Sequence, residues 1–202
     1  MSKEIWNSIN PPSGTGTVDI KVGGTIHTGR SQRTSTPIFK PEDAAITGLD
    51  KILTVVQEAK PEFVTITDVS IGKEGGNVVV TGKSNSSKLA FSLGAGDIPV
   101  TLPPNFTAGG MTARNNSPIP GDPGAAAEFE FTMTVPIPAN TAATSRTKVI
   151  NVAAAGGQSA AATITQSAGE PALSLSKDSV TVPAEGTPVT VTVNSNIQWK
   201  AE

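Results

Sequence analysis

The sequence contains no cysteine and no tyrosine, and it has a single histidine, His27. Without cysteine the chain can form neither a disulfide framework nor a thiolate metal site. One histidine leaves carboxylates as the remaining metal ligands, and the Asp-x-Asp-x-Asp series of calcium loops does not occur in the sequence. We therefore expect no metal and no cofactor, and a fold stabilised by strand pairing and an aliphatic core.

The sequence also lacks a marked excess of positive or negative charge. Fifteen basic and seventeen acidic residues give a formal net charge of −2, without a basic cluster. Binding to nucleic acid depends on neutralising several phosphates, so we expect no nucleic-acid partner. No apolar run approaches the ~20 residues that span a bilayer, and the first residues lack the apolar segment of a signal peptide. The sequence thus predicts no membrane segment and a protein that stays in the cytoplasm where it is made.

Candidate catalytic groups are few. The residues beside His27 include no carboxylate that could complete a nucleophilic triad. Glu128 and Glu130 are a possible carboxylate pair, but they alternate with Phe129 and Phe131. That alternation is typical of the solvated face of a strand. We predict that the protein is not an enzyme.

The residues that are abundant favour strands and turns: the chain has 20 Gly and 16 Pro, with only 16% charged residues. From residue 62 onward, apolar and polar residues alternate in about seven short segments separated by Gly, Pro and Asn turns. This pattern predicts a β-sandwich over residues 61–168. The stretch 103–124, rich in Gly, Pro and Asn, is expected to be a long irregular loop.

The first sixty residues have two patterns. Residues 1–40 are expected to form an extended β arm, because Val18, Ile20 and Val22 alternate with polar neighbours. Residues 41–60 are expected to contain one short amphipathic α-helix that Pro61 ends. The helix prediction depends on apolar residues spaced by three and four positions: Ile46, Leu49, Leu53 and Val56.

An internal repeat relates the end of the chain to its middle. Residues 74–85 match residues 185–196 without a gap, at a constant offset of 111 positions, and each copy ends in Ser-Asn. Residues 169–202 are therefore expected to begin a second module. That part alone would leave valines uncovered. Either the protein is longer, which we favour, or a neighbouring subunit supplies the remaining strands.

The second copy has paired strands around Gly186, followed by Ser195-Asn196 and Trp199, and it resembles the opening half of a BACON domain. The first copy is similar to the closing half of that family, with a strand beginning at Arg146 and a last strand ending in Gln166. Lys88 and Leu89 stand where the family has its Trp. The resemblance covers about residues 62–202.

BACON domains are small immunoglobulin-like modules. The resemblance implies an all-β fold: an immunoglobulin-like (BACON-like) β-sandwich with an N-terminal extended β arm and one short α-helix, followed by the start of a second sandwich. It also implies that Trp199 belongs to the core of its module.

Modules of this family occur in secreted glycan-handling proteins of Bacteroidota, and similar ones occur in structural proteins of their bacteriophages, crAss-like phages included. Together with the polar start of the chain, the resemblance favours a virion protein assembled in the host bacterial cytoplasm, either a head fibre or an auxiliary capsid protein. Its modules would provide weak multivalent adhesion. A glycan- or mucin-binding BACON module of a bacterial surface protein and a tail-fibre component remain as alternatives.

The expected partners are capsid or other virion proteins, host or mucus glycans, and further copies of the chain, with a trimer favoured. Residues 1–60 are the expected attachment region, because they combine an aromatic residue, strand edges and a helix with one apolar face. Trp6 suits a pocket on a partner. The candidate partner-binding residues are Ile5, Trp6, Arg30, Arg33, Leu49 and Leu53.

Overall fold

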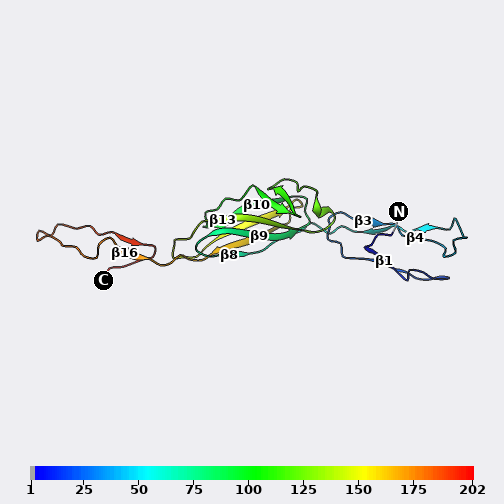
Figure 1. Cartoon of the computed structure of the whole chain (residues 1–202), viewed down its shortest axis with the longest axis horizontal. Helices are drawn as coiled ribbons and strands as arrows, with labels where there is room; N and C mark the ends of the chain where they lie inside the picture. Colours follow the sequence, from blue (N-terminus) through cyan, green and yellow to red (C-terminus); the bar gives the residue numbers. More distant parts are fainter. Residues whose placement is uncertain (1–2) are drawn as a thin grey trace.

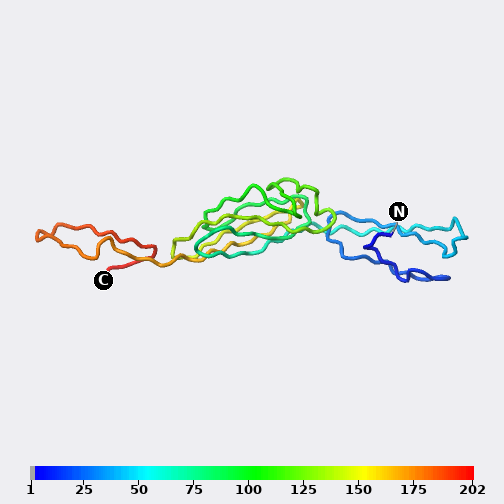
Figure 2. Tube along the Cα trace, viewed as in Figure 1, coloured from blue at the N-terminus to red at the C-terminus, as the bar shows by residue number. Residues whose placement is uncertain are grey.

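The computed structural model describes residues 3–202 and is nearly all β. The molecule is elongated, with a sandwich in the middle, an N-terminal region at one end and a C-terminal hairpin at the opposite end (Figure 1). The chain passes through these three parts once and in sequence order (Figure 2). Residues 1 and 2 of the expected β arm lie outside the described residues.

The central sandwich consists of two sheets, with strand orders β12-β11-β13-β9-β7 and β10-β14-β15-β8. The chain changes sheet after its first strand, so that β7 pairs antiparallel with β9 whereas β8 pairs in parallel with the last strand, β15. The bounds are β7 Val64–Ile66, β8 Val69–Ile71, β9 Gly76–Ser84, β10 Leu89–Gly96, β11 Asn105–Ala108, β12 Met111–Arg114, β13 Phe129–Ile137, β14 Arg146–Ala154 and β15 Ser159–Gln166.

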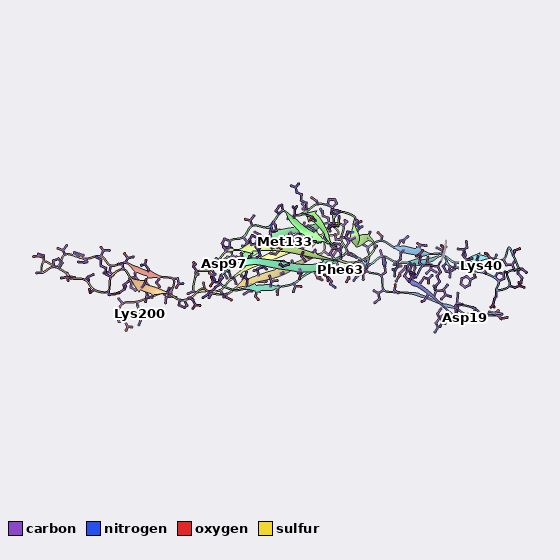
Figure 3. All side chains as sticks on the ribbon, in the orientation of Figure 1. Asp19, Lys40, Phe63, Asp97, Met133 and Lys200 are labelled. Carbon is purple, nitrogen blue, oxygen red and sulfur yellow. The ribbon has the colours of Figure 1, made fainter. Side chains whose placement is uncertain are left out.

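The core lies between these sheets and follows from the period of two in the strands. Every second residue of β13, from Phe129 to Ile137, is buried. Phe91 from the other sheet contacts Phe131 edge-to-face, with ring centroids 5.5 Å apart. Met133 lies in the middle of the sandwich, between the end marked by Phe63 and the end marked by Asp97 (Figure 3). The alternation predicted for residues 61–168 is therefore confirmed as a sandwich-like arrangement of sheets.

The stretch 103–124 is more regular than the predicted loop. Its middle forms the hairpin β11–β12, whose turn is made by Gly109 and Gly110 at left-handed φ values of 55° and 81°. A short 3-10 helix, η1 (Pro123–Ala125), follows. The prediction was wrong here because Phe106 and Ala108 alternate inward within a segment dominated by turn residues, and both are buried.

The N-terminal region contains three short strand pairs: β1–β2, β3–β6 and β4–β5. Because β3 leads into β4 and β5 leads into β6, the last two pairs form one long hairpin around residues 40–50. The bounds are β1 Asn7–Asn10, β2 Lys21–Gly24, β3 Arg33–Ser35, β4 Ile38–Phe39, β5 Lys51–Ile52 and β6 Val55–Gln57.

The α-helix predicted over residues 41–60 is wrong. Residues 40–50 form a loop with Gly48 at φ 79°, and residues 51–57 are extended. Leu53, Val55 and Gln57 are half-buried and alternate with exposed neighbours, so burial in this segment follows the two-residue period of a β-strand. Pairing with β3 and β4 outweighs the weak helical spacing, since tertiary context commonly overrides local propensity.

The C-terminal hairpin is formed by β16 (Leu173–Leu175) and β17 (Val193–Ser195), with a turn at Gly186. Trp199 is 53% exposed, so its predicted core position is wrong in this structure. The physical reason is that residues 169–202 form a single sheet layer, and no second layer faces it within the part of the chain that is described. Other exposed apolar residues here are Leu173, Leu175, Val180, Val182, Val189 and Ile197.

Candidate interaction site at the module junctions

Asn85 connects the N-terminal region to the sandwich. It is fully buried just after β9, and its Oδ1 accepts a hydrogen bond from the Phe63 N–H at 3.0 Å. Its Nδ2 donates to the carbonyl oxygens of Thr28 at 3.1 Å and Pro61 at 3.2 Å. Ser84 Oγ donates to the Phe63 carbonyl at 2.6 Å. One Ser-Asn pair thus binds a loop of the N-terminal region to the first strand of the sandwich.

The same arrangement recurs between the sandwich and the C-terminal hairpin. Asn196 Oδ1 accepts from the Ala172 N–H at 2.8 Å, and its Nδ2 donates to the carbonyl oxygens of Thr141 at 2.7 Å and Glu170 at 2.8 Å. Ser195 Oγ donates to the Ala172 carbonyl at 3.1 Å. We call this arrangement the Ser-Asn junction; it is formed by Ser84-Asn85 in one place and Ser195-Asn196 in the other.

Arg30, a candidate partner-binding residue, lies at the first Ser-Asn junction. Its guanidinium forms ion pairs with Asp122 and with Glu62, where Nε and Oε1 are 3.9 Å apart. The neighbouring Gly29 is packed so closely that a Cβ there would lie 2.4 Å from the carbonyl carbon of Ala126. Arg30 therefore fixes the N-terminal region on the sandwich within one chain.

Trp6 and Arg33, two other candidates, are in contact. The guanidinium carbon of Arg33 lies 4.6 Å from the centroid of the Trp6 ring, a cation–π arrangement. Arg33 Nε donates to Gln57 Oε1 at 2.9 Å, and Nη2 donates to the Thr25 carbonyl at 2.9 Å. Trp6 is half-buried by this packing, whereas the adjacent Ile5 is fully exposed.

The Arg33–Gln57 pair has a counterpart in the sandwich. Arg146 Nε donates to Gln166 Oε1 at 2.8 Å, and Nη2 donates to the Pro138 carbonyl at 2.9 Å. Each Arg is the register partner of its Gln, in β3–β6 and in β14–β15. The hairpin of the N-terminal region thus has the construction of the last hairpin of the sandwich.

Sequence reasoning missed this second repeat, although a signal is present. Residues 54–57 read Thr-Val-Val-Gln and residues 163–166 read Thr-Ile-Thr-Gln. The arginines are 113 positions apart and the glutamines 109, because the loop 40–50 is longer than its counterpart. A comparison without gaps therefore finds the copy at residues 185–196 and not this one.

The last two candidates lie on the same N-terminal hairpin. Leu49 is exposed in the loop 40–50, and Leu53 is half-buried, with its N–H donating to the Pro37 carbonyl at 3.0 Å. The structure thus brings Trp6 and Arg33 together, places Arg30 at the junction, and leaves Leu49 on the surface of the loop.

An ion pair accompanies the second Ser-Asn junction. Lys73, before β9, donates a hydrogen bond to the carboxylate of Glu170, which immediately precedes the hairpin. This hydrogen bond raises the pKa of Lys73 above its ordinary 10.5 and lowers the pKa of Glu170 below its ordinary 4.5. Both groups are charged at neutral pH, and the pair adds a contact between sandwich and hairpin.

Glu128 and Glu130 flank a common cation: Lys83 Nζ lies 3.7 and 3.8 Å from their carboxylates. Lys83 and Glu130 are exposed, and Glu128 is half-buried just before β13. Within residues 3–202, no group of three or more His, Asp or Glu side chains is arranged to hold a metal ion. Over the same residues, no helix is long and apolar enough to cross a membrane.

In comparisons with known proteins, no family model and no curated sequence matches the chain.

Proposed function

We propose that the protein is a non-enzymatic structural component of a phage particle, a head fibre or auxiliary capsid protein. It docks through its N-terminal region and displays immunoglobulin-like modules for weak multivalent adhesion. The observation that carries this proposal is the in-line arrangement of the three parts, with a Ser-Asn junction on each side of the sandwich (Figure 1). A rod of this construction holds a module away from the surface to which one end is attached.

The immunoglobulin-like assignment is supported by two mainly antiparallel sheets that enclose one apolar core. The BACON-like assignment is supported by the roles of the residues that carry the resemblance. Gln166 is fully buried and accepts from Arg146, and Ser84 and Asn85 organise the first strand. These are structural roles, in agreement with a module that is used for display.

The experiment is immunogold imaging of intact particles with an antibody against the sandwich. Label on the capsid is the expected result; label on the tail alone would favour the tail-fibre alternative, and unlabelled particles would contradict a virion role. A variant lacking residues 3–24 keeps Thr28 and Arg30 at the first junction. It should fold by circular dichroism and yet be absent from particles, whereas its normal incorporation would contradict docking by the N-terminal region.

The exposed ring of Trp199 favours the glycan-binding alternative over other second functions, because aromatic faces bind sugars through their amphipathic rings. A mucin-glycan array tests it. Saturable binding that Trp199→Ala abolishes, by a protein not found on particles, would replace the virion proposal with this one.

A further inference from the structure

The two end parts of the molecule have the strand registers of the two halves of one sandwich. The C-terminal hairpin pairs Leu173 with Ser195, as β7–β9 pairs Val64 with Ser84. The N-terminal hairpin repeats the β14–β15 pairing in two places. Arg33–Gln57 corresponds to Arg146–Gln166, and Phe39–Lys51 corresponds to Val152–Ala160. One end therefore corresponds to the opening half of a module and the other end to the closing half.

β2 corresponds to the end of β13. The offset of 113 that relates Arg33 to Arg146 places Val18, Ile20 and Val22 at the positions of Phe131, Met133 and Val135. The three β13 residues are buried in the sandwich core, whereas Val18, Ile20 and Val22 are 44%, 37% and 41% exposed. The N-terminal region thus exposes side chains that occupy a core in the complete module.

The C-terminal hairpin has valines that correspond to core residues on the facing strand of the sandwich, β9. The offset of 111 places Val189 and Val191 at the positions of Val78 and Val80 in β9, both of which are buried. In the hairpin Val189 is exposed and Val191 half-buried. In the sandwich β9 pairs with β13. The C-terminal hairpin therefore has the counterpart of β9 without a β13 strand beside it, and the N-terminal region has the counterpart of β13 without a β9 strand beside it.

One edge of β2 is free to accept such a strand, because among the strands of residues 3–202 β2 pairs with β1 alone. The Thr25 N–H donates to the Trp6 carbonyl, so the backbone groups of odd-numbered residues in this strand point toward β1. The equivalent groups of β13 point toward β11, as shown by Glu130, whose carbonyl accepts from the Gly109 N–H. β1 therefore occupies the β11 side, and the side that β9 takes in the sandwich is open.

The apolar face next to this edge is also open. Grooves in the N-terminal region are lined by Ile9, Pro12, Ile38 and Phe39, and beside them by Val18 and Ile20. In the sandwich the corresponding space between the sheets is filled by the core. The N-terminal region thus has both a backbone edge and, beside it, grooves with apolar side chains in their walls, which suit a strand with inward-facing valines.

We propose that a second copy of this chain fills this site, with the C-terminal hairpin of one copy completing a module with the N-terminal region of the next. The β9–β13 register sets the pairs: Val191 beside Ile20, and Val189 beside Val22. Residues 180–182 pair in parallel with β6, as β8 does with β15.

Side-chain volumes agree with this pairing. In the sandwich Phe131 faces Gly82, where a Cβ would lie 2.3 Å from Cζ of Phe131. The corresponding residues are Val18 and Val193, so a large–small pair is replaced by two of intermediate size. The contact joins different surfaces of the two copies, which lie at opposite ends of an elongated molecule (Figure 1). Successive copies therefore continue into open head-to-tail rows, in contrast to the trimer expected by comparison with virion fibres. In a row, only the terminal copy presents its N-terminal region to a capsid. The inference goes beyond the proposed function and does not depend on it.

Cysteine cross-linking tests the register, because the chain has no cysteine of its own. Lys21 and Thr190 correspond to Thr134 and Val79, which are direct partners, and both are exposed. Their pair is of the non-hydrogen-bonded type, whose Cα separation of about 4.5 Å suits a disulfide. Mixing Lys21→Cys with Thr190→Cys under mild oxidation should give a disulfide-linked dimer. Mixing Lys21→Cys with Thr192→Cys, two residues out of register, should give little; equal yields would overturn the proposal.

Light scattering of the full chain tests the assembly. The expected result is a mass that grows with concentration in multiples of 20.5 kDa. Val189→Asp, whose side chain would face inward in the completed module, should restore the monomer, whereas Thr190→Asp, whose side chain would face outward, should leave the rows intact. Both positions are exposed, so neither variant endangers folding. A monomer at every concentration, or rows that survive Val189→Asp, would overturn the proposal.

Discussion

The side chain of Asn115 makes both hydrogen bonds to the backbone of Phe91 that a neighbouring strand would make. Its Oδ1 accepts from the Phe91 N–H at 2.8 Å, and its Nδ2 donates to the Phe91 carbonyl at 3.0 Å. Phe91 lies in β10, one of the two edge strands of the four-stranded sheet. One amide therefore occupies part of an edge that could otherwise pair with another chain.

Asn115→Ala should lower the free energy of unfolding by about 1–3 kcal/mol, because two backbone groups lose their partner. It should also increase aggregation on heating, measured by light scattering. Asn105→Ala is the control, since Asn105 is exposed on β11. Equal stability of the two variants would contradict the role assigned to Asn115.

The two Ser-Asn junctions should contribute differently to the free energy of unfolding. Asn85 is fully buried, so Asn85→Ala removes hydrogen bonds that are shielded from water and should cost about 1–3 kcal/mol. Asn196 is exposed, so water replaces its hydrogen bonds and Asn196→Ala should cost less than about 1 kcal/mol. Chemical denaturation followed by tryptophan fluorescence and circular dichroism measures both, and a larger loss for Asn196→Ala would contradict this assignment.

Gly75 and Gly157 provide a matched pair of turn glycines. Both have left-handed φ, 73° and 89°, so alanine at either costs about 1–2 kcal/mol of backbone strain. At Gly75 a Cβ would also lie 2.4 Å from the Ile137 carbonyl oxygen, whereas at Gly157 no atom lies within 4 Å. Gly75→Ala should therefore lower the melting temperature clearly more than Gly157→Ala. Similar melting temperatures would contradict this and would show that the backbone before β9 moves to accommodate the added Cβ.

The ion pair at the second junction should depend on pH. The pKa of Glu170 is lowered by Lys73, so the contribution of the pair is present above the ordinary value of 4.5 and is lost as the pH falls through the lowered pKa. Lys73→Met should move the pKa of Glu170 back up toward 4.5, measured by NMR titration of its carboxyl carbon. An unchanged titration would mean that the pair does not form in solution.

The sandwich could be predicted from the sequence because Phe129 to Ile137 and its partner strands alternate with a period of two that burial reproduces. The long hairpin of the N-terminal region could not, because Leu49, Leu53 and Val56 match a helical spacing as well as a strand. Pairing between β4 and β5 decides between them, and that contact is not local.

The candidate site was predictable only in outline. Trp6 and Arg33 were both identified, but a cation–π contact between residues 27 positions apart requires the fold. The Ser-Asn repeat was visible as a motif, whereas its function as a junction depends on carbonyl groups of Thr28 and Thr141, which side-chain patterns do not report.

The parallel pairing of β8 with β15 has a mechanical consequence. These strands lie near the two ends of the module's chain, and Val69 to Ile71 runs alongside Ile164 to Gln166 in the same direction. Tension applied along the molecule pulls β8 from its start and β15 from its end, so the load shears all hydrogen bonds of the pair together instead of opening them one by one. Such a module should resist stretching to a high force before it unfolds in a single event, which atomic-force pulling of the sandwich would record, whereas gradual unfolding at low force would contradict it.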